Sequence, residues 1–267
     1  MGVNVRAKRH LFNDVCEELI LLYKTMQDLG SDNFMERVNS VIKKYSLSDS
    51  CTFGYKFYGC DSSRGLASYN KEKFCQLRDD FNSLDKSDEM YSLLLYVLIV
   101  YSFNNQIRFN SKRKFNLPVG KRDFNKRMKT KLKNFIDEIQ KTETTFTSMD
   151  FREIKIKSLT SEDFVYVDPP YLITCATYNE LGGWTEKDEI DLLTYLDELS
   201  ENQVKFALSN VLESKGEVNE ILQDWVASNP QYLTIQLDYS YKNSNYQKRN
   251  KELDTKEVLI VNYKEQI

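Results

Sequence analysis

Four apolar runs of strand length divide the second half of the chain. They read FVYV at 164–167, VKFALSN at 204–210, YLTIQL at 232–237 and EVLIVNY at 257–263. Segments with helical periodicity separate them, which is the pattern of an α/β fold. The sequence therefore predicts a sheet with helices on both faces, parallel in its first strands. Thr185–Asp188 resembles a capping box and predicts the start of one of these helices.

The first half of the chain has mostly helical periodicity. A short apolar stub ending at Leu11-Phe12 predicts a strand before the first helix, and a stretch rich in turn residues at 46–65 predicts a loop. The last helix of this half is apolar almost all round, so we expect it to be buried. The pattern predicts helices over 14–29, 33–45, 71–82 and 87–103.

Composition restricts the class of protein. The 267 residues are 41% hydrophobic and carry a formal net charge of −3, which excludes a wholly disordered chain and a uniformly basic coat protein. The longest apolar run, 93–100, is shorter than the roughly 20 residues of a membrane-spanning helix, and no signal-peptide pattern follows the N-terminus. We expect a cytoplasmic protein that has no membrane partner.

Cysteine and histidine usage argues against a disulfide framework and a metal site. The five cysteines form an odd set without a CxxC pair, and the single histidine, His10, has no ligand spacing around it. We expect reduced thiols and no bound metal. The cysteines are Cys16, Cys51, Cys60, Cys75 and Cys175.

One segment is strongly basic. Between Arg108 and Lys133 there are eleven lysines and arginines and one acidic residue, Asp123. Cations of this density bind phosphates, and interspersed Asn and Arg side chains reach base edges; the alternative is a solvated helix face. A smaller patch lies at 242–251. The candidate DNA-binding residues are Arg108, Asn110, Lys112, Arg113, Asn116, Lys121, Arg122, Lys126 and Arg127.

The tetrapeptide Asp168-Pro169-Pro170-Tyr171 follows the apolar run 164–167. In open α/β sheets, ligands bind at the carboxyl ends of strands. The prolines stiffen the chain, so the Asp168 carboxylate and the Pro169 carbonyl form a rigid pair of acceptors beside an aromatic ring. Such a corner suits the amino group of an extruded base; the alternative is a stiff turn with Tyr171 packed on the core. The polar loop 174–184 after it has the composition of a mobile lid.

These motifs, in this order, resemble the Dam-type DNA adenine-N6 methyltransferases. RFN at 108–110 with FNLPVG at 115–120 resembles the family segment RYNxxGxFNxPxG, with Arg113 in place of the glycine. FCQLRDDFN at 74–82, Ser209-Asn210 and the final strand also match. The resemblance implies a Rossmann-like methyltransferase sheet with an inserted helical target-recognition subdomain. Its implied division is 1–50 and 141–267 for the catalytic domain and 51–140 for the recognition subdomain.

The resemblance also implies roles for individual residues. S-adenosylmethionine would donate the methyl group, with Asp14 at its ribose and Asp150 and Phe151 at its adenine. The DPPY residues Asp168, Pro169, Pro170 and Tyr171 would be catalytic, and Asp168 would also lie at the cofactor. Asp14 and Asp150 have an alternative as helix-cap or turn residues. The implied partners are double-stranded DNA and a cognate restriction endonuclease.

One departure from the family gives rise to a second hypothesis. Family members begin with a strand and a glycine-rich loop that cradle the cofactor, whereas the N-terminus here resembles the sequence downstream of that loop. We therefore expect weak cofactor binding if Met1 is an internal position of a longer chain. The alternative function is a DNA-binding remnant without catalysis, and a third is a methyltransferase that acts on RNA or protein.

Overall fold

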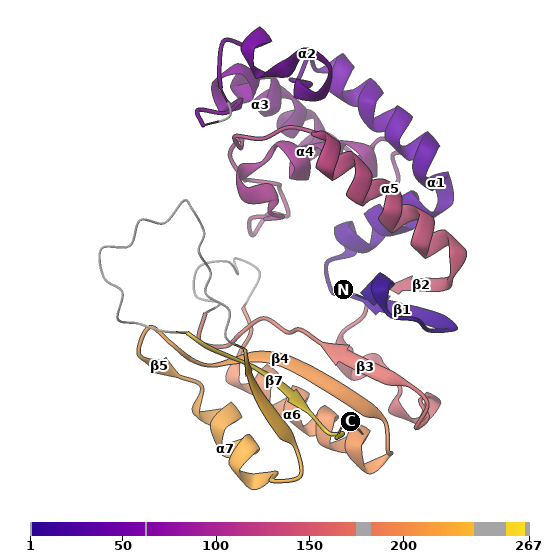
Figure 1. Cartoon of the computed structure of the whole chain (residues 1–267), viewed down its shortest axis with the longest axis vertical. Helices are drawn as coiled ribbons and strands as arrows, with labels where there is room; N and C mark the ends of the chain where they lie inside the picture. The colour runs from indigo at the N-terminus through magenta and orange to yellow at the C-terminus, as the bar shows by residue number, and fades with distance from the viewer. Residues whose placement is uncertain (1, 62, 175–182, 238–254, 265–267) are drawn as a thin grey trace. The chain divides into compact units, whose positions relative to one another are not determined.

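The computed structural model describes residues 2–61, 63–174, 183–237 and 255–264. The chain divides into two compact units, Met1–Asp150 and Phe151–Ile267 (Figure 1). The three-part division expected from the family resemblance stays a prediction.

The first unit combines five helices with one pair of parallel strands. Strands β1 and β2 pair in register from Arg9↔Glu143 to Asn13↔Thr147, and α1 and α5 pack against β2. The elements of this unit are β1 (Arg9–Asn13), α1 (Glu17–Lys44), α2 (Ser50–Phe57), α3 (Ala67–Ser83), α4 (Tyr91–Tyr101), α5 (Lys126–Lys141) and β2 (Glu143–Thr147), with short 3-10 turns at Gly2–Asn4 and Phe103–Asn105.

Helix α1 has a break at Gly30. This glycine has a φ of +72°, which L-residues with a side chain adopt only with strain. The halves before and after it correspond to the helices predicted over 14–29 and 33–45, so both predictions are confirmed. Phe34 and Val38 of the second half are fully buried against α4 and its neighbours.

The prediction of a loop over 46–65 is wrong for residues 50–57, which form α2. Asp49 caps this helix by accepting a hydrogen bond from the Thr52 amide at 3.2 Å. The helix buries none of its residues and is interrupted at Gly54, which has a φ of +72°. The helix is short, contains a glycine and is bordered by turn residues, so the sequence pattern was that of a loop.

Helix α4 forms the centre of the first unit's core. Nine of its residues are buried, and the Tyr101 hydroxyl donates a hydrogen bond to the Ser48 carbonyl. The predicted start at residue 87 is wrong, because the Asp85 carboxylate accepts the Ser87 amide and holds a turn before the helix. Helix α3 also begins earlier than predicted, at Ala67 instead of 71.

The second unit contains a mixed five-stranded sheet. Its strand order is β3-β4-β7-β6, with β5 paired to β4. Strands β3 and β4 are parallel, as predicted for the first strands, whereas β7 runs antiparallel to both β4 and β6. The elements are β3 (Phe164–Val167), α6 (Glu186–Glu201), β4 (Lys205–Ser214), β5 (Glu217–Val218), α7 (Glu220–Ser228), β6 (Leu233–Leu237) and β7 (Lys256–Val261), with 3-10 turns at Phe151–Glu153 and Ile156–Ser158.

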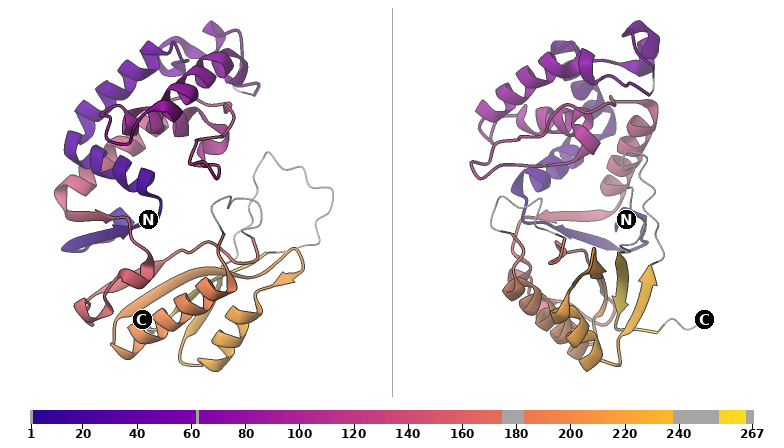
Figure 2. Two further views of the ribbon diagram at one scale, coloured as in Figure 1. Left: turned by 180° about the vertical axis from the view of Figure 1, so that it is seen from behind. Right: turned by 90° about the vertical axis from the view of Figure 1, so that its left-hand side faces the viewer.

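Helices α6 and α7 pack against each other and against β4, on one side of the strands (Figure 2). Leu196, Phe206 and Leu222 form the centre of this core. On β3, Phe164 and Tyr166 alternate with the inward-facing Val165 and are 47% and 41% exposed. The fold is thus mixed α/β as predicted, but the described helices of this unit share one face of its sheet instead of covering both.

The capping box predicted at the start of α6 is confirmed. The Thr185 hydroxyl accepts the Asp188 amide, and the Asp188 carboxylate accepts the Thr185 amide at 2.9 Å. In the described part of the chain, no helix combines the length and the apolar character needed to cross a membrane.

Candidate active site and basic surface

The Asp168–Tyr171 corner lies where β3 ends. Val167 pairs with Leu208 of β4, so the corner is next to Ser209 on the neighbouring strand. The Tyr171 hydroxyl donates to Asp168 Oδ1 at 3.0 Å and is 3.1 Å from Ser209 Oγ. Carboxylate, phenol and hydroxyl therefore form one connected polar group at the carboxyl end of a parallel strand, where α/β folds bind ligands.

The acceptors of this corner are open. Asp168 and Pro170 are exposed, Pro169 and Tyr171 are half-buried, and Tyr171 is not part of the unit's buried core. Among the described residues, none donates a hydrogen bond to Asp168 Oδ2 or to the Pro169 carbonyl. Two acceptor oxygens are thus available to a ligand with two N–H donors.

Two residues that the sequence did not single out as site residues lie beside the corner. Ser209 binds the Tyr171 hydroxyl, and Glu257 of β7 pairs with Val211 two positions further along β4. Burial, together with the negative charge of Asp168, raises the pKa of Glu257. In the sequence, Ser209 stands out only through the pair Ser209-Asn210 that matches the family. Glu257 carries no signal because it lies in an ordinary strand.

Phe151, a predicted cofactor contact, is part of an aromatic cluster. Its ring centroid is 6.0 Å from that of Trp184 and 5.9 Å from that of Tyr195, and the Arg152 guanidinium lies 4.5 Å from the ring centroid. The Trp184 indole donates to the buried Glu189 carboxylate at 2.6 Å. The described end of the predicted lid is therefore fixed on α6, while its residues 175–182, including Cys175, lie outside the described residues.

Asp14 and Asp150 follow the two parallel strands of the first unit. Asp14 comes directly after β1, and its amide donates to the Thr147 carbonyl at 3.2 Å. The Asn13 side chain binds both the amide and the carbonyl of Met149. These bonds bring both acids to the carboxyl edge of the β1–β2 pair.

The Asp14 side chain is exposed. One of its oxygens accepts the Cys16 amide at 2.7 Å, and Cys16, not Asp14, is the N-cap residue of α1. The Cys16 amide is two positions after Asp14, so this contact is of the local cap or turn kind that the alternative describes. Asp150 is half-buried and also makes contacts within the chain.

Several side chains of the basic segment make hydrogen bonds within the protein. Arg108 donates to the Asn116 side chain at 2.7 Å, and the Asn110 side chain accepts the amides of Lys112 and Lys114 at 3.0 Å each. Arg113 donates to both oxygens of the Glu18 carboxylate at 2.7 Å. These candidate DNA-binding residues thus shape the segment that carries them.

Other cations of the segment face solvent. Lys112, Lys121, Lys126 and Arg127 are exposed, and none of them makes an ion pair with another described residue. Arg122 is also exposed and is 3.4 Å from the Tyr55 hydroxyl. The one acid, Asp123, is fully buried and accepts hydrogen bonds from Ser48 and Ser50. The outward surface of the segment is therefore positive. The second basic patch at 242–251 lies outside the described residues.

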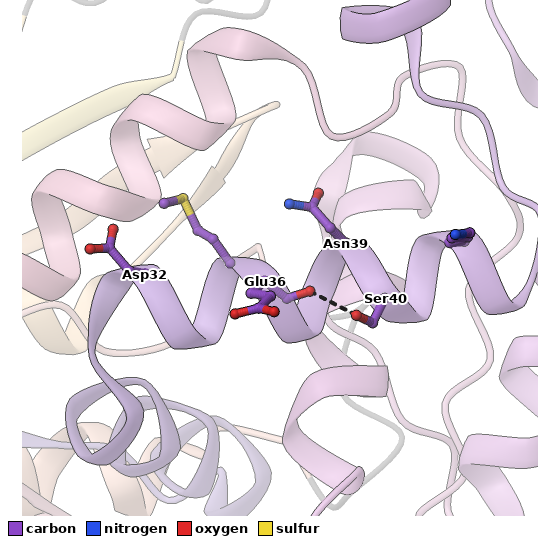
Figure 3. Close-up of a pocket in the computed structure, with 6 residues that line it drawn as sticks. Asp32, Glu36, Asn39 and Ser40 are labelled. Carbon is purple, nitrogen blue, oxygen red and sulfur yellow. Dashed lines mark hydrogen bonds between the residues drawn. The ribbon is translucent and has the colours of Figure 1, made fainter.

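Two shallow hollows in the first unit are separate from these groups. The one in Figure 3 is lined by side chains of the second half of α1 alone, among them Asp32, Glu36, Asn39 and Ser40. The other is lined by residues 3–8 and the end of α5. The described ranges contain no group of three or more metal-binding side chains.

The chain matches a known protein family. The family model of the D12 class N6 adenine-specific DNA methyltransferases matches residues 1–241. The chain belongs to this family.

Individual relatives are similar over nearly the whole chain. Modification methylase StsI of Streptococcus sanguinis is 33% identical and type II methyltransferase M.FokI of Planomicrobium okeanokoites 34% identical, each across 98% of this chain. Modification methylase LlaI of Lactococcus lactis subsp. lactis is 33% identical across 84% of it. The chain spans 37%, 37% and 33% of the lengths of these relatives, respectively.

Proposed function

We propose that this protein is a site-specific DNA adenine methyltransferase that transfers a methyl group from S-adenosylmethionine to N6 of adenine in duplex DNA. The observation that carries the proposal is the open pair of acceptors at Asp168 and Pro169, at the carboxyl end of a parallel strand in a chain of the D12 family. The names of the similar modification methylases support the same reaction.

The corner would act by positioning the base. An adenine extruded from the duplex presents an exocyclic amine with two N–H donors. The Asp168 carboxylate and the Pro169 carbonyl accept these hydrogens and increase the electron density on N6, while the Tyr171 ring stacks on the base. Pro170 keeps the turn stiff. Direct attack by N6 on a methyl carbon needs no covalent intermediate on the protein, so alignment is the main contribution.

We infer that Asp14, Asp150 and Phe151 would hold S-adenosylmethionine, which supplies the reactive methyl group when bound. The exposed Asp14 carboxylate suits the two hydroxyls of a ribose, since it is an acceptor at the carboxyl end of a strand. Asp150 and Phe151 would hold the adenine, one through a polar contact and the other through its ring. Asp168 would border the methyl group.

The basic segment would bind the duplex. The exposed cations Lys112, Lys121, Lys126 and Arg127 suit phosphates, and Arg122 extends the same surface. Arg108, Asn110 and Asn116 would support this surface through the bonds that they make inside it. Since two of the relatives are named modification methylases, we also propose a cognate restriction endonuclease as a partner in the same system.

Two binding measurements on the full chain test the proposal. Calorimetric titration with S-adenosylmethionine measures cofactor binding, and gel-shift titration of duplex DNA at two salt concentrations measures the electrostatic part of DNA binding. The proposal predicts heat of binding for the cofactor and a DNA affinity that falls with salt. DNA binding without cofactor binding supports the inactive remnant instead, and the absence of both contradicts the two functions together.

A further inference from the structure

A buried carboxylate connects α1 to the basic segment. Glu18 lies in the first turn of α1, and its side chain is 1% exposed. Arg113 Nη2 is 2.7 Å from both of its oxygens, and Lys86 Nζ is 3.1 Å from Oε1. Glu18 thus joins three segments that are distant in sequence: the start of α1, the α3–α4 connection and the basic segment.

Arg113 belongs to a tight hairpin, residues 109–115, which we call the basic hairpin. Phe109 and Phe115 pair across its base and are 6% and 1% exposed, so the base is part of the core. The Asn110 amide donates to the Lys114 carbonyl at 2.9 Å, and the Arg113 amide donates to the Asn110 carbonyl at 2.8 Å. The tip carries the exposed Lys112 into solvent.

The backbone at Arg113 does not favour an arginine. Its φ is +58°, in the left-handed region where glycine fits without strain and a residue with a Cβ does not. The hairpin would therefore form more easily with glycine at this position. The contact that an arginine adds is the charge-assisted hydrogen bonding of Nη2 to both oxygens of Glu18.

The ion pair is electrostatically favourable despite the burial of Glu18. Burial by itself raises the pKa of this carboxyl, but hydrogen bonds from its own amide and from Lys86, together with the charges of Lys86 and Arg113, lower it overall. Glu18 is therefore ionised at neutral pH. Arg113 and Lys86 together neutralise this buried carboxylate, so loss of the Arg113 contact leaves Glu18 with one partner instead of two.

We propose that Glu18 and Arg113 anchor the basic hairpin, so that Arg113 positions the tip for DNA binding and does not itself contact DNA. This inference rests on the proposed DNA-methylating function. It assigns Glu18 a positioning role for the DNA surface, although this residue is buried and acidic. Lys112 at the tip is the residue that the anchor presents to a phosphate.

The test uses four variants. Three of them remove the anchor: Glu18→Gln, Arg113→Gly and the double variant that combines these two. The fourth, Lys112→Gln, removes the charge at the tip. The probe is a fluorescein-labelled duplex of mixed sequence, titrated over a range of salt concentrations. Glu18→Gln and Arg113→Gly should each weaken binding about tenfold, and the double variant should weaken it no more than either single one. Both single variants should leave unchanged the slope of log affinity against log salt concentration, whereas Lys112→Gln should reduce this slope by about 1.

Amide hydrogen exchange provides a second readout. In the free protein, Glu18→Gln should speed exchange in residues 109–115 and leave the core of α4 unchanged, a local effect that general destabilisation does not produce. The proposal is overturned if Arg113→Gly lowers the salt slope by about 1 while Glu18→Gln changes neither binding nor exchange. If the unmodified protein binds no DNA, the proposed function fails, whereas exchange still tests the anchor.

Discussion

The Tyr171 hydroxyl donates a hydrogen bond to Asp168 Oδ1 over 3.0 Å, and its ring is thereby tied to the carboxylate beside it. Burial raises the pKa of Tyr171 to about 12, with the charges of Asp168 and Glu257 adding to the effect. The hydroxyl therefore stays protonated at neutral pH and keeps its role as donor. The bond occupies one oxygen of Asp168 and leaves the other for a base.

We expect Asp168→Ala to lower the methylation rate by a factor of about 100 or more, because preorganised charge at the reacting nitrogen is a large part of such catalysis. DNA affinity should change little, since Asp168 is not part of the basic surface. The rate is measured by methyl incorporation into unmethylated DNA. Glu162→Ala, an exposed acid just before β3, is the matched control. Equal losses in both variants would show that Asp168 has no specific role.

Two substitutions at Tyr171 separate the role of its ring from the role of its hydroxyl. Tyr171→Phe keeps the stacking face and releases Asp168, so we expect activity within a few-fold of the original. Tyr171→Ala loses base stacking of about 1–3 kcal/mol, which corresponds to a loss of about 5- to 150-fold in activity. Steady-state methylation of both variants checks this order. A greater loss in the Phe variant than in the Ala variant would contradict a stacking role.

The exposed cations should determine the salt dependence of DNA binding. Changing Lys121, Lys126 or Arg127 to Gln should each reduce the slope of log affinity against log salt by about 1. Lys133→Gln is the control, since its ammonium is 3.1 Å from Asp32 and 3.6 Å from Asp137. Titration at several salt concentrations measures the slope. A larger effect at Lys133 than at the three exposed positions would place the DNA surface elsewhere.

Much of the fold could be predicted from hydrophobic periodicity. The strands β3, β4, β6 and β7 lie where apolar runs predicted them, and the box at Thr185 marks the start of α6. Strand β2 was missed because ETTFT alternates over only five residues and has two buried positions, Thr144 and Phe146, of which only Phe146 is apolar. Helix α2 was missed because it is short and because its glycine and the turn residues around it are typical of a loop. Helix α5 was missed although it buries Leu132, Ile136 and Ile139, because its many lysines were interpreted only as a basic surface.

The site could be predicted only in part. A run of cations indicates a basic segment, but not which cations are paired inside the protein, because partners are brought together by the fold. Glu18 is 95 positions from Arg113, and no local pattern links them. The same holds for Ser209, which reaches Tyr171 only because β4 pairs with β3. Sequence identified the motif, and pairing of the strands supplied its neighbours.

The capping box of α6 leads to a prediction on stability and pH. The pKa of Asp188 is lowered to about 2, first by the hydrogen bond from the Thr185 hydroxyl and further by Arg152. Since this pKa lies below the ordinary 3.8, the stabilisation is present above that value and is lost as the pH falls toward about 2.

Thr185→Ala should therefore lower the free energy of unfolding by about 1 kcal/mol at neutral pH, and by less in acid. Urea unfolding at neutral and acidic pH measures the difference. Thr194→Ala, an exposed position on the same helix, should cost little. If Thr185→Ala lowers the free energy of unfolding equally at every pH, the Thr185 hydroxyl is not what lowers the pKa of Asp188.

The most direct test of the central claim is the chemical identity of the product. The full chain is incubated with S-adenosylmethionine carrying a deuterated methyl group and with unmethylated duplex DNA, and the nucleosides are then analysed by mass spectrometry. The account predicts deuterated N6-methyldeoxyadenosine, absent with Asp168→Ala. A labelled cytosine, or labelled adenine formed equally well without the Asp168 carboxylate, would contradict it.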